Sequence, residues 1–439
     1  MDRKWVAIAR HGWVDAMPSR VGCALERRRL RKQFDELARL FASYAGVPGL
    51  GEDERIVILR TIREAMVQCL ADLEVAKRYW KFNRLVTNVP KTIDDFSDDW
   101  LRQHCRFVGW EIKEIMRILE IPSTIRVRGT GRVFTGEEGM LVMLRRLASL
   151  DTLHQMSATF DRHASGLSEL HNAMLDLVYP YAKRALQLEV WESELPRLAK
   201  ELHDEGCLIP TCCGFVDGTI FKIRRPTEGE EAAYNGWKRM HATKYQAVVL
   251  SNFMVADFDG PHPGSAADPN MLRRSNLVER LREIVDRLGT SVSLYGDAAY
   301  PLSTVLYRPY RNETTAVQAR FNEDMSTFRL AVEWVFGKLE QLWPFVGDKT
   351  RRAVLLRQTR KEDVISALLT NFHTCLCGGV TTDYFGIAPP TLQEYERLVL
   401  AHVRGTTCTG VRPADFFIQM LTFSLQLFKK TWPRVCNHP

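Results

Sequence analysis

Three acidic residues stand where a carboxylate can do chemistry. Asp217 lies within the mostly apolar segment CCGFVDGTIFKIRRP, Asp297 follows the apolar run SLYG, and Glu333 lies within FRLAVEWVFGKLE. Mg²⁺ prefers oxygen ligands, usually one or two carboxylates together with water and substrate phosphates. When two such ions lie close together, one can activate the attacking oxygen of a phosphodiester cleavage and the other can stabilise the leaving oxygen. The three acids therefore predict a divalent-metal site.

Strands are expected to position the first two acids. The apolar runs on either side of Asp217, with a Gly-Thr step after it, predict two strands joined by a tight turn, with the carboxylate at a sheet edge. Asp297 ends another apolar strand. If these strands are neighbours, both carboxylates can project from the same edge of one sheet.

A helix is expected to carry the third acid. Glu333 is surrounded by Val332, Val335 and other apolar residues at helical spacing, so it lies beside a buried face. An unpaired carboxylate near a core is costly unless it is paired or binds a metal. Arg329, one turn earlier, offers the alternative of an ordinary ion pair at i,i+4.

The wider pattern from about residue 208 predicts an α/β fold. Strand-like segments come first, including an apolar pair with a hairpin at Ser251-Asn252, and they are followed by a loop over 260–270, a helix over 270–289, a strand near 291–300 and a helix near 326–343. Strands that later alternate with helices indicate a mixed sheet flanked by helices. Two more helices near the C-terminal end are expected to pack on it.

The first half of the chain is predicted to be helical. Apolar residues at three- and four-residue steps predict helices over 22–90, and one amphipathic helix over 98–122 closed by Pro122. The basic segment around Gly129 and Gly131 is expected to be a surface turn. Thr135 with Glu138 three residues on predicts a capping box at the start of the next helix.

Three helices after Thr135, with a short middle one and a tight turn before the last, fit a helix-turn-helix unit. Such a unit can read DNA. The exposed positions of its third helix include Glu169 and Asp176, however, so a purely structural packing role is the competing interpretation.

The composition favours a soluble protein with a polyanionic partner. The 439 residues carry a formal net charge of +7, and no apolar run approaches membrane-spanning length. Ten scattered cysteines and an N-terminus without a long apolar stretch favour a reducing compartment, the cytosol or the nucleus. A basic cluster could be a nuclear import signal, a phosphate-contacting face or a solvated helix face: Arg27, Arg28, Arg29, Arg31 and Lys32.

The second half of the chain resembles the PIF/Harbinger superfamily of DDE transposases, including the domesticated Harbinger-derived nucleases of animals. The matching phrases occur in the family's order from about residue 205 to 378: GFVDGTIFKIRRP, YNGWKRMHATKYQAVV, GPHPGSAADPNML, LYGDAAYP, FNEDMSTFRLAVEWVFGKL and NFHTCLC. The match is looser over the upstream helical region from TGEEGM to SELHN.

The resemblance implies an RNase H-like catalytic core, with the first acid on the first strand, the second after the fourth strand and the third on a following helix. It makes Asp217, Asp297 and Glu333 the metal-binding triad, holding Mg²⁺, with Mn²⁺ able to substitute and two ions expected. The implied reaction is hydrolysis at transposon ends, followed by attack of the freed 3′-hydroxyl on target DNA. The implied setting is the nucleus, with double-stranded DNA, a Myb-like partner protein and a homo-oligomer.

Other residues of the motifs have open roles. Six basic residues are candidate DNA contacts: Arg224, Arg225, Lys238, Arg239, His241 and Lys244. Asp268 lies where the family has a short loop near the site, and it can also be read as a helix N-cap. Tyr300 and Pro301 are expected to shape the turn after Asp297. The potential zinc ligands fit no common spacing and are better interpreted as buried thiols and a histidine: Cys207, Cys212, Cys213, His373, Cys375 and Cys377.

These patterns and the resemblance divide the chain into four regions. Residues 1–95 form a helical region for dimerisation or partner docking, 96–205 a helical region with the helix-turn-helix-like unit, 206–378 the catalytic domain and 379–439 a helical tail. The function expected is that of an active cut-and-paste transposase. The alternatives are a domesticated DNA-binding or scaffold protein that does not cleave, and a metal-dependent nuclease without strand transfer.

Overall fold

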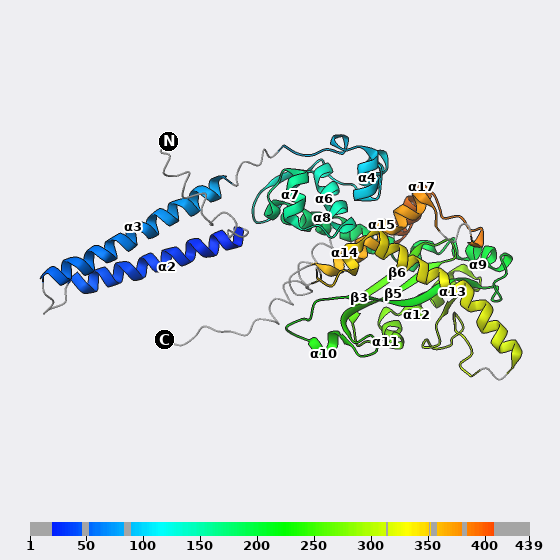
Figure 1. The fold of residues 1–439 in the computed structure, drawn as a ribbon. Coiled ribbons are helices and arrows are strands. Elements are labelled where there is room, and N and C mark those ends of the chain that lie inside the picture. The colour runs from blue at the N-terminus through cyan, green and yellow to red at the C-terminus, as the bar shows by residue number, and fades with distance from the viewer. Residues whose placement is uncertain are drawn as a thin grey trace. The chain divides into compact units, whose positions relative to one another are not determined.

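The computed structural model describes residues 20–45, 52–82, 89–312, 315–350, 352, 358–379 and 384–407. The chain divides into two compact units between Val89 and Pro90 (Figure 1). The first unit is a pair of helices and the second contains the sheet. No helix in the described ranges is long and apolar enough to cross a membrane.

The first unit consists of α2 (Arg20–Ala45) and α3 (Glu52–Phe82), which lie side by side. Leu30, Cys69 and Leu73 are buried between them, because their helical spacing brings them onto facing stripes. The Cys69 thiol also donates a hydrogen bond to the Leu30 carbonyl at 3.2 Å. The helices predicted over 22–90 are confirmed, among the described residues, as far as Phe82.

The basic cluster lies on α2. The side chains of Arg28, Arg31 and Lys32 are exposed, and that of Arg27 lies outside the described residues. Its use in nuclear import or in phosphate binding stays a prediction, as does a docking role for this unit.

The second unit begins with a helical part. A short antiparallel ribbon of β1 and β2 is closed by a turn in which Gly129 and Gly131 have positive φ, as the predicted surface turn requires. The elements are η1 (Ile93–Asp95), α4 (Asp98–Cys105), α5 (Gly109–Ile118), β1 (Thr124–Arg126), β2 (Val133–Thr135), α6 (Gly136–Ala148), α7 (Leu153–Phe160), α8 (Ala164–Ala185), η2 (Leu188–Trp191) and α9 (Leu195–Asp204).

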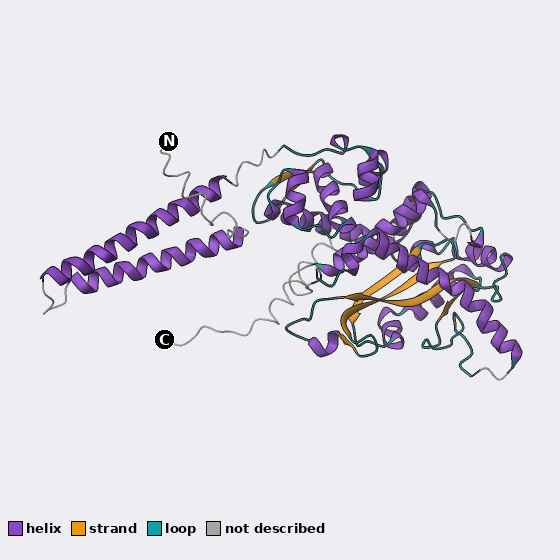
Figure 2. Ribbon diagram, viewed as in Figure 1, coloured by secondary structure: helices purple, strands orange, loops and turns teal. Residues whose placement is uncertain are grey.

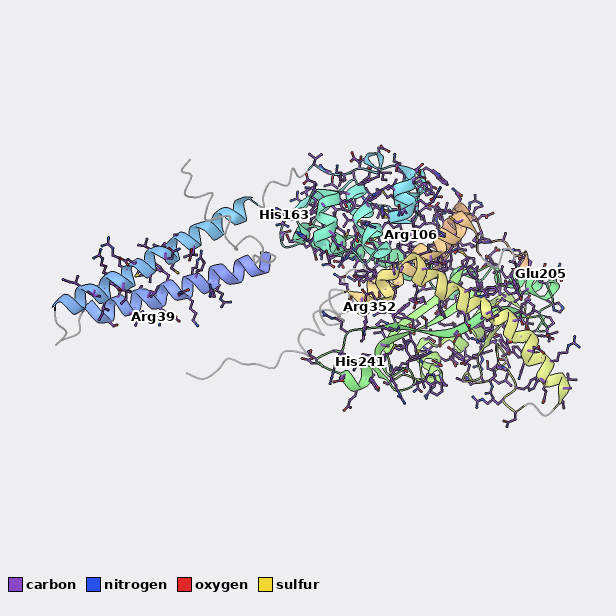
Figure 3. All side chains as sticks on the ribbon, in the orientation of Figure 1. Arg39, Arg106, His163, Glu205, His241 and Arg352 are labelled. Atoms are coloured by element: carbon purple, nitrogen blue, oxygen red, sulfur yellow. The ribbon has the colours of Figure 1, made fainter. Side chains whose placement is uncertain are left out.

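The single helix predicted over 98–122 is wrong, because α4 and α5 are separate. Arg106 adopts a left-handed conformation with φ of 72° and ends α4. Its guanidinium donates to the carbonyls of Leu342 and Ala148, each at 3.0 Å, which anchors the break in the interior (Figure 3). Glu111 then accepts a hydrogen bond from the Val108 N–H at 2.8 Å and starts α5. Long-range contacts therefore override the helical periodicity.

The next helix starts with half of the predicted capping box. The Thr135 hydroxyl accepts a hydrogen bond from the Glu138 N–H at 3.2 Å. The Glu138 carboxylate turns inward instead and pairs with Arg162 at 2.6 and 2.9 Å, where both side chains are buried. An interior ion pair therefore takes the place of the reciprocal capping bond.

Helices α6, α7 and α8 form the three-helix unit predicted from the sequence, with a left-handed Asp161 after the short middle helix. Two acids of α8 pair with other parts of the chain at the protein surface. Glu169 accepts hydrogen bonds from Thr130 at 3.0 Å and Arg132 at 3.3 Å, and Asp176 pairs with Lys361 of α15. DNA reading by this unit stays a prediction.

The second part of this unit is a six-stranded mixed sheet, and this confirms the predicted α/β fold (Figure 2). Its order is β4-β5-β3-β7-β8, with β6 also paired to β5. The pairs β3–β7 and β7–β8 are parallel and the others are antiparallel. The strands are β3 (Cys212–Lys222), β4 (Tyr234–Asn235), β5 (Met240–Leu250), β6 (Val255–Pro263), β7 (Ser293–Gly296) and β8 (Leu306–Tyr307).

The two strands and tight turn predicted around Asp217 are wrong, because β3 is one continuous strand. It pairs with β5 without interruption from Gly214 to Lys222. Gly218 does not serve a turn. A Cβ there would lie 3.0 Å from Asp268 Oδ1 and 3.1 Å from Met271 Cε, so the glycine allows a helix to approach the strand closely.

Helices cover both faces of the sheet, with α13 and α15 on one side and α11 and α12 on the other (Figure 1). The single helix predicted over 270–289 is two helices, because Asn276 adopts a left-handed conformation between them. The loop predicted from 260 begins only after Pro263. The helices are α10 (Glu230–Ala233), α11 (Asp268–Ser275), α12 (Leu277–Leu288), α13 (Ala316–Leu342), α14 (Pro344–Gly347), α15 (Thr359–Cys377) and α17 (Leu392–Thr407).

One core runs through the second unit, from Ile93 to Val399. Helix α17 belongs to it, because the buried Tyr395 hydroxyl donates to the Ala185 carbonyl at 3.0 Å and accepts from Asn371 at 3.1 Å. The regions 96–205, 206–378 and 379–407 therefore share one packed interior. Their separate functional roles stay predictions.

Candidate metal and nuclease site

Asp217 and Asp297 follow neighbouring positions of two parallel strands. β3 and β7 are in register at Val216 and Gly296, and the next residue of each chain segment is one of the acids. Asp217 Oδ1 accepts a hydrogen bond from the Gly218 N–H at 2.7 Å. Asp297 Oδ1 accepts one from the backbone two residues on, at 2.9 Å. Adjacent strands are about 4.8 Å apart, so the acids are brought together where β7 ends.

The Asp217 carboxyl is electrostatically crowded. Burial raises its pKa from 3.8 to about 6. The Gly218 N–H and Arg329 act to lower this pKa, whereas Asp297 and Asp268 raise it further. The side chain is only 19% exposed. The negative charges of Asp297 and Asp268 thus act on the Asp217 carboxyl, and a cation bound beside it would offset them.

Glu333 is connected to Asp217 through Arg329. Arg329 Nη1 lies 2.7 Å from Asp217 Oδ2, and Nη2 lies 2.7 Å from Glu333 Oε1. The second contact is the i,i+4 pair that stood as the alternative to metal binding. The Glu333 side chain is 48% exposed, so α13 directs it toward solvent beside the site. The structure thus brings all three predicted acids to one region, with a guanidinium between two of them.

Asp268 lies close enough to Asp217 to raise its pKa, as the family resemblance predicts for a loop near the site. The N-cap interpretation is wrong, because Ala267 holds the cap position and Asp268 is the first residue of α11. Its Oδ1 accepts a hydrogen bond from Lys244 Nζ at 2.6 Å. The packing of α11 on β3 brings it to Asp217, and Gly218 leaves room for it.

Tyr300 closes the site from the interior. Its N–H donates to the Asp297 carbonyl at 3.2 Å, which forms the turn after β7, and its ring is fully buried. Burial raises the pKa of the hydroxyl, and the charges of Asp268, Asp217 and Asp297 raise it further. No hydrogen-bond partner of this hydroxyl lies among the described residues. It is a neutral donor available beside the acids.

The donor chemistry fits a hard divalent cation. Asp217 and Asp297 supply carboxylate oxygens at one sheet position, as Mg²⁺ prefers. In the described part of the chain, however, no three His, Cys, Asp or Glu side chains are grouped so that they could hold a metal ion. Glu333 Oε1, which would complete the predicted set of metal ligands, accepts a hydrogen bond from Arg329 instead. The two aspartates fit the predicted ion, and the role of all three acids as its ligands stays a prediction.

The basic residues predicted to contact DNA differ in their surroundings. Lys244 is buried and paired with Asp268, and His241 lies 3.1 Å from Glu230 at the α10 end of the sheet (Figure 3). Arg225 also pairs with Glu230, at 2.8 Å, although its side chain is 72% exposed. The remaining three are exposed: Arg224, Lys238 and Arg239. DNA contact by any of the six stays a prediction.

The cysteines of the described ranges are free thiols. Cys207, Cys212 and Cys213 are buried together near the start of β3, and burial raises the pKa of Cys213 to about 12. Cys375 is half-buried and Cys377 is exposed on α15. These surroundings agree with the interpretation of most of them as buried thiols.

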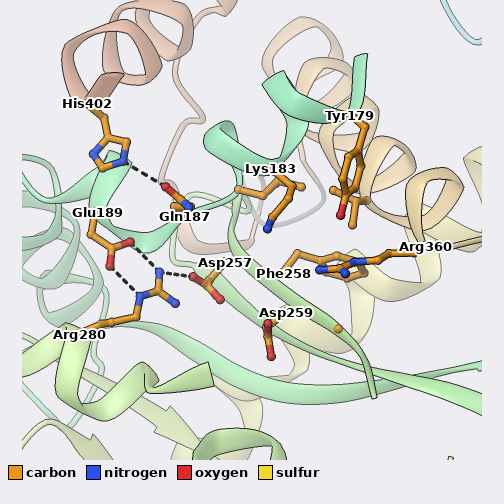
Figure 4. Close-up of a pocket in the computed structure, with 13 residues that line it drawn as sticks. Tyr179, Lys183, Gln187, Glu189, Asp257, Phe258, Asp259, Arg280, Arg360 and His402 are labelled. Atoms are coloured by element: carbon orange, nitrogen blue, oxygen red, sulfur yellow. Dashed lines mark hydrogen bonds and ion pairs between the residues drawn. The ribbon is translucent and has the colours of Figure 1, made fainter. Parts of the chain in front are cut away.

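A pocket of about 380 Å³ lies elsewhere, between β6 and the helices α8, α12, α15 and α17 (Figure 4). Arg280 is held there by Glu189 and Asp257, with nitrogen–oxygen distances of 2.6 Å. Lys183 and Arg360 extend toward its centre. None of the three predicted acids lines it, so this pocket is separate from the candidate site.

Comparison with known proteins agrees with the geometry. The chain is 23% identical over 225 residues to Protein Antagonist of Like Heterochromatin Protein 1 from Arabidopsis thaliana, and the match covers 48% of this chain and 56% of that relative. The chain thus spans little more than half of the relative's length. No solved structure matches the chain. Residues 216–371, which run from β3 into α15 and include Asp217, Asp297 and Glu333, match the family model of the DDE superfamily endonucleases.

Proposed function

We propose that this protein is a metal-dependent DNA endonuclease that acts through Asp217, Asp297 and Glu333. The observation that carries the proposal is the register of β3 and β7, which brings two carboxylates together at the end of a parallel strand pair. The match to DDE superfamily endonucleases spans all three acids. Divalent ions bound there would activate a water and stabilise the leaving oxygen of a phosphodiester.

The protein's own groups prepare this chemistry. The backbone N–H of Gly218 fixes the Asp217 carboxylate, and the N–H of Ala299 fixes that of Asp297. Fixed carboxylates lose little entropy when a cation and a phosphate arrive. The Arg329 guanidinium, whose side chain is 24% exposed, would be a second positive charge for a phosphate oxygen bound beside the acids.

We further propose that the reaction is that of a PIF/Harbinger transposase. The ordered motifs from about 205 to 378 support this assignment, and with it cleavage at transposon ends followed by 3′-hydroxyl attack on target DNA. Mg²⁺, double-stranded DNA, a Myb-like partner, self-association and the nucleus are parts of the same proposal. The net charge of +7 favours a polyanionic substrate.

Two assays test the proposal in sequence. Nicking of supercoiled plasmid, with Mg²⁺ or Mn²⁺ and with EDTA as control, measures the endonuclease. Joining of pre-cleaved 3′-hydroxyl ends to a plasmid measures strand transfer. Cleavage and joining together support a transposase. Cleavage without joining supports a plain nuclease, and metal-independent cleavage contradicts the metal-dependent reaction.

The second candidate is a domesticated DNA-binding or scaffold protein that does not cleave. The position of Arg329 favours it, because its guanidinium bridges Asp217 and Glu333 where the predicted metal would need their oxygens. The matched relative carries the name of an antagonist of another protein rather than that of an enzyme. Specific DNA binding without nicking in any divalent metal would support this candidate over the enzyme.

A further inference from the structure

A tryptophan stands exposed at the tip of the β4–β5 hairpin. Trp237 is 90% exposed, more than any other large apolar side chain in the described ranges. The next most exposed tryptophan there, Trp110 of α5, is 61% exposed. Exposed aromatic side chains gain most from a partner with a flat apolar face, because stacking removes that face from water. The exposed indole of Trp237 is therefore accessible to a binding partner.

The hairpin holds this tip in a defined shape. Asn235 pairs with Met240 across the two strands, so four residues form the loop between them. The buried Asn235 side chain donates to the Gly264 carbonyl at 2.7 Å and accepts from the Lys238 N–H at 2.8 Å. A loop fixed at its base loses little conformational freedom on binding.

Two exposed cations lie next to Trp237 in the loop. Lys238 and Arg239 follow Trp237 directly, and both side chains are exposed. The backbone of Arg239 is left-handed, with φ of 51°. Cations outnumber carboxylates in this end of the sheet: Lys222, Arg224, Arg225, Lys238 and Arg239 against Glu228, Glu230 and Glu231. An exposed aromatic side chain beside cations is a combination that binds nucleic acid strands.

The tip lies on the same ribbon of strands as the acids. Asp217 pairs with Ala247 of β5, and β5 begins at Met240, seven residues earlier. At about 3.3 Å per residue the ribbon extends roughly 23 Å from the acids toward the tip. This corresponds to about seven nucleotides at 3.4 Å each. The tip and the acids are thus separated by a distance that one short duplex can span.

We propose that Trp237 stacks its indole on an unpaired or unstacked base of the bound DNA, while Lys238 and Arg239 contact the neighbouring phosphates. The proposal rests on the proposed function, since it takes DNA as the ligand. Base stacking requires no particular sequence, so the contact would select distorted DNA over intact duplex. It would hold a strand opened about seven nucleotides from the cleavage position.

The test compares full-length wild type with Trp237→Ala, Trp237→Phe and the matched control Trp110→Ala. Fluorescence anisotropy measures binding to a labelled intact duplex and to the same duplex with a short mismatched bubble. Wild type and Trp110→Ala should prefer the bubble. Trp237→Ala should weaken bubble binding about tenfold, as expected for the loss of one stacked base, and Trp237→Phe should retain part of the preference. Lys238→Gln with Arg239→Gln should instead weaken both probes and lower the salt slope by about two.

Three outcomes would overturn the proposal. If wild type binds and nicks DNA but Trp237→Ala binds both probes like Trp110→Ala, the stacking contact fails and the proposed function stands. If wild type binds neither probe, both fail together. If Trp237→Ala loses self-association in sedimentation while its DNA binding is unchanged, the tip is a protein contact instead. Circular dichroism confirms that each variant is folded.

Discussion

Arg329 Nη1 lies 2.7 Å from Asp217 Oδ2, which ties helix α13 to the centre of strand β3. The same guanidinium reaches Glu333 Oε1 at 2.7 Å. A cation thus already lies between two acids that are far apart in sequence. This arrangement stabilises the carboxylates in the absence of a divalent ion, and it sets up a competition between Arg329 and any metal bound there.

Replacing Arg329 should strengthen the binding of a divalent cation. Arg329→Gln removes a positive charge that competes for the oxygens of Asp217 and Glu333. Half-maximal thermal stabilisation by Mg²⁺ should then occur at about fivefold lower concentration, which corresponds to ~1 kcal/mol for a partly exposed ion pair. Arg320→Gln, on an exposed position of the same helix, is the control. An unchanged Mg²⁺ dependence would show that Arg329 and the metal do not compete.

Replacing Asp217 should stabilise the fold at neutral pH. Its pKa is raised from 3.8 to about 6 in the native state, so the native state binds the proton more tightly than the unfolded state. The stabilising contribution is complete below about pH 4 and is lost as the pH rises to about 6. Asp217→Asn should therefore raise the free energy of unfolding at about pH 7 by up to ~3 kcal/mol.

Urea unfolding at about pH 4 and about pH 7 measures this difference, without divalent metal in the buffer. The gain from Asp217→Asn should shrink at the lower pH. Asp286→Asn, at an exposed position of α12, is the matched control and should change little. A variant that is less stable than wild type at neutral pH would contradict the crowding of the carboxylates.

Adding a methyl group at Gly218 should disturb the site. The new Cβ would lie 3.0 Å from Asp268 Oδ1 and 3.1 Å from Met271 Cε, so these two side chains must move by a few tenths of an ångström. The nicking rate of Gly218→Ala should fall about 10- to 10²-fold through misplacement of the acids. Gly337→Ala on α13 is the control, because its Cβ would meet open space. Equal rates for both variants would show that the approach of α11 to β3 is unimportant.

A buried ion pair should dominate the stability of the adjacent region. The Arg352 guanidinium pairs with Asp363, with Nη2 2.7 Å from Oδ2, and both side chains are fully buried. The Cζ atom of Arg352 also lies 5.4 Å from the ring centre of Phe221 on β3. Arg352→Met alone should cost about 3–5 kcal/mol, because it leaves a buried carboxylate unpaired.

Combining Arg352→Met with Asp363→Leu should recover much of that loss, since no charge is then left without a partner. Urea unfolding of the single and double variants measures both effects. A loss below about 1 kcal/mol for the single variant would place the pair in the range of exposed ion pairs instead.

Local patterns predicted the elements better than their boundaries. The acid-ending strand at Asp297 and the helix around Glu333 follow from apolar spacing, and both are present. Arg106 and Asn276 each interrupt a predicted helix by adopting left-handed conformations. Nothing in the periodicity marks these breaks, because at Arg106 the stabilising contacts come from carbonyls distant in the sequence.

At the candidate site, too, the sequence did not predict the contacts between distant elements. Gly218 reads as a turn residue in sequence, yet its role is to admit Asp268 beside the strand. The i,i+4 spacing predicts the pairing of Arg329 with Glu333, but not the second contact with Asp217. Contacts between distant elements depend on how the sheet and helices pack, and a single sequence carries no direct signal for them.

Asp217, Asp297 and Glu333 are proposed to support metal-dependent cleavage together. The most direct test is the rate of plasmid nicking in Mg²⁺ by Asp217→Asn, Asp297→Asn and Glu333→Gln, with Asp286→Asn and Glu340→Gln as controls. Each of the three site variants should lose about 10²-fold or more, as is usual when a preorganised charge at a reaction centre is removed. The controls should match wild type. Equal nicking by the wild type and all three site variants would contradict the account.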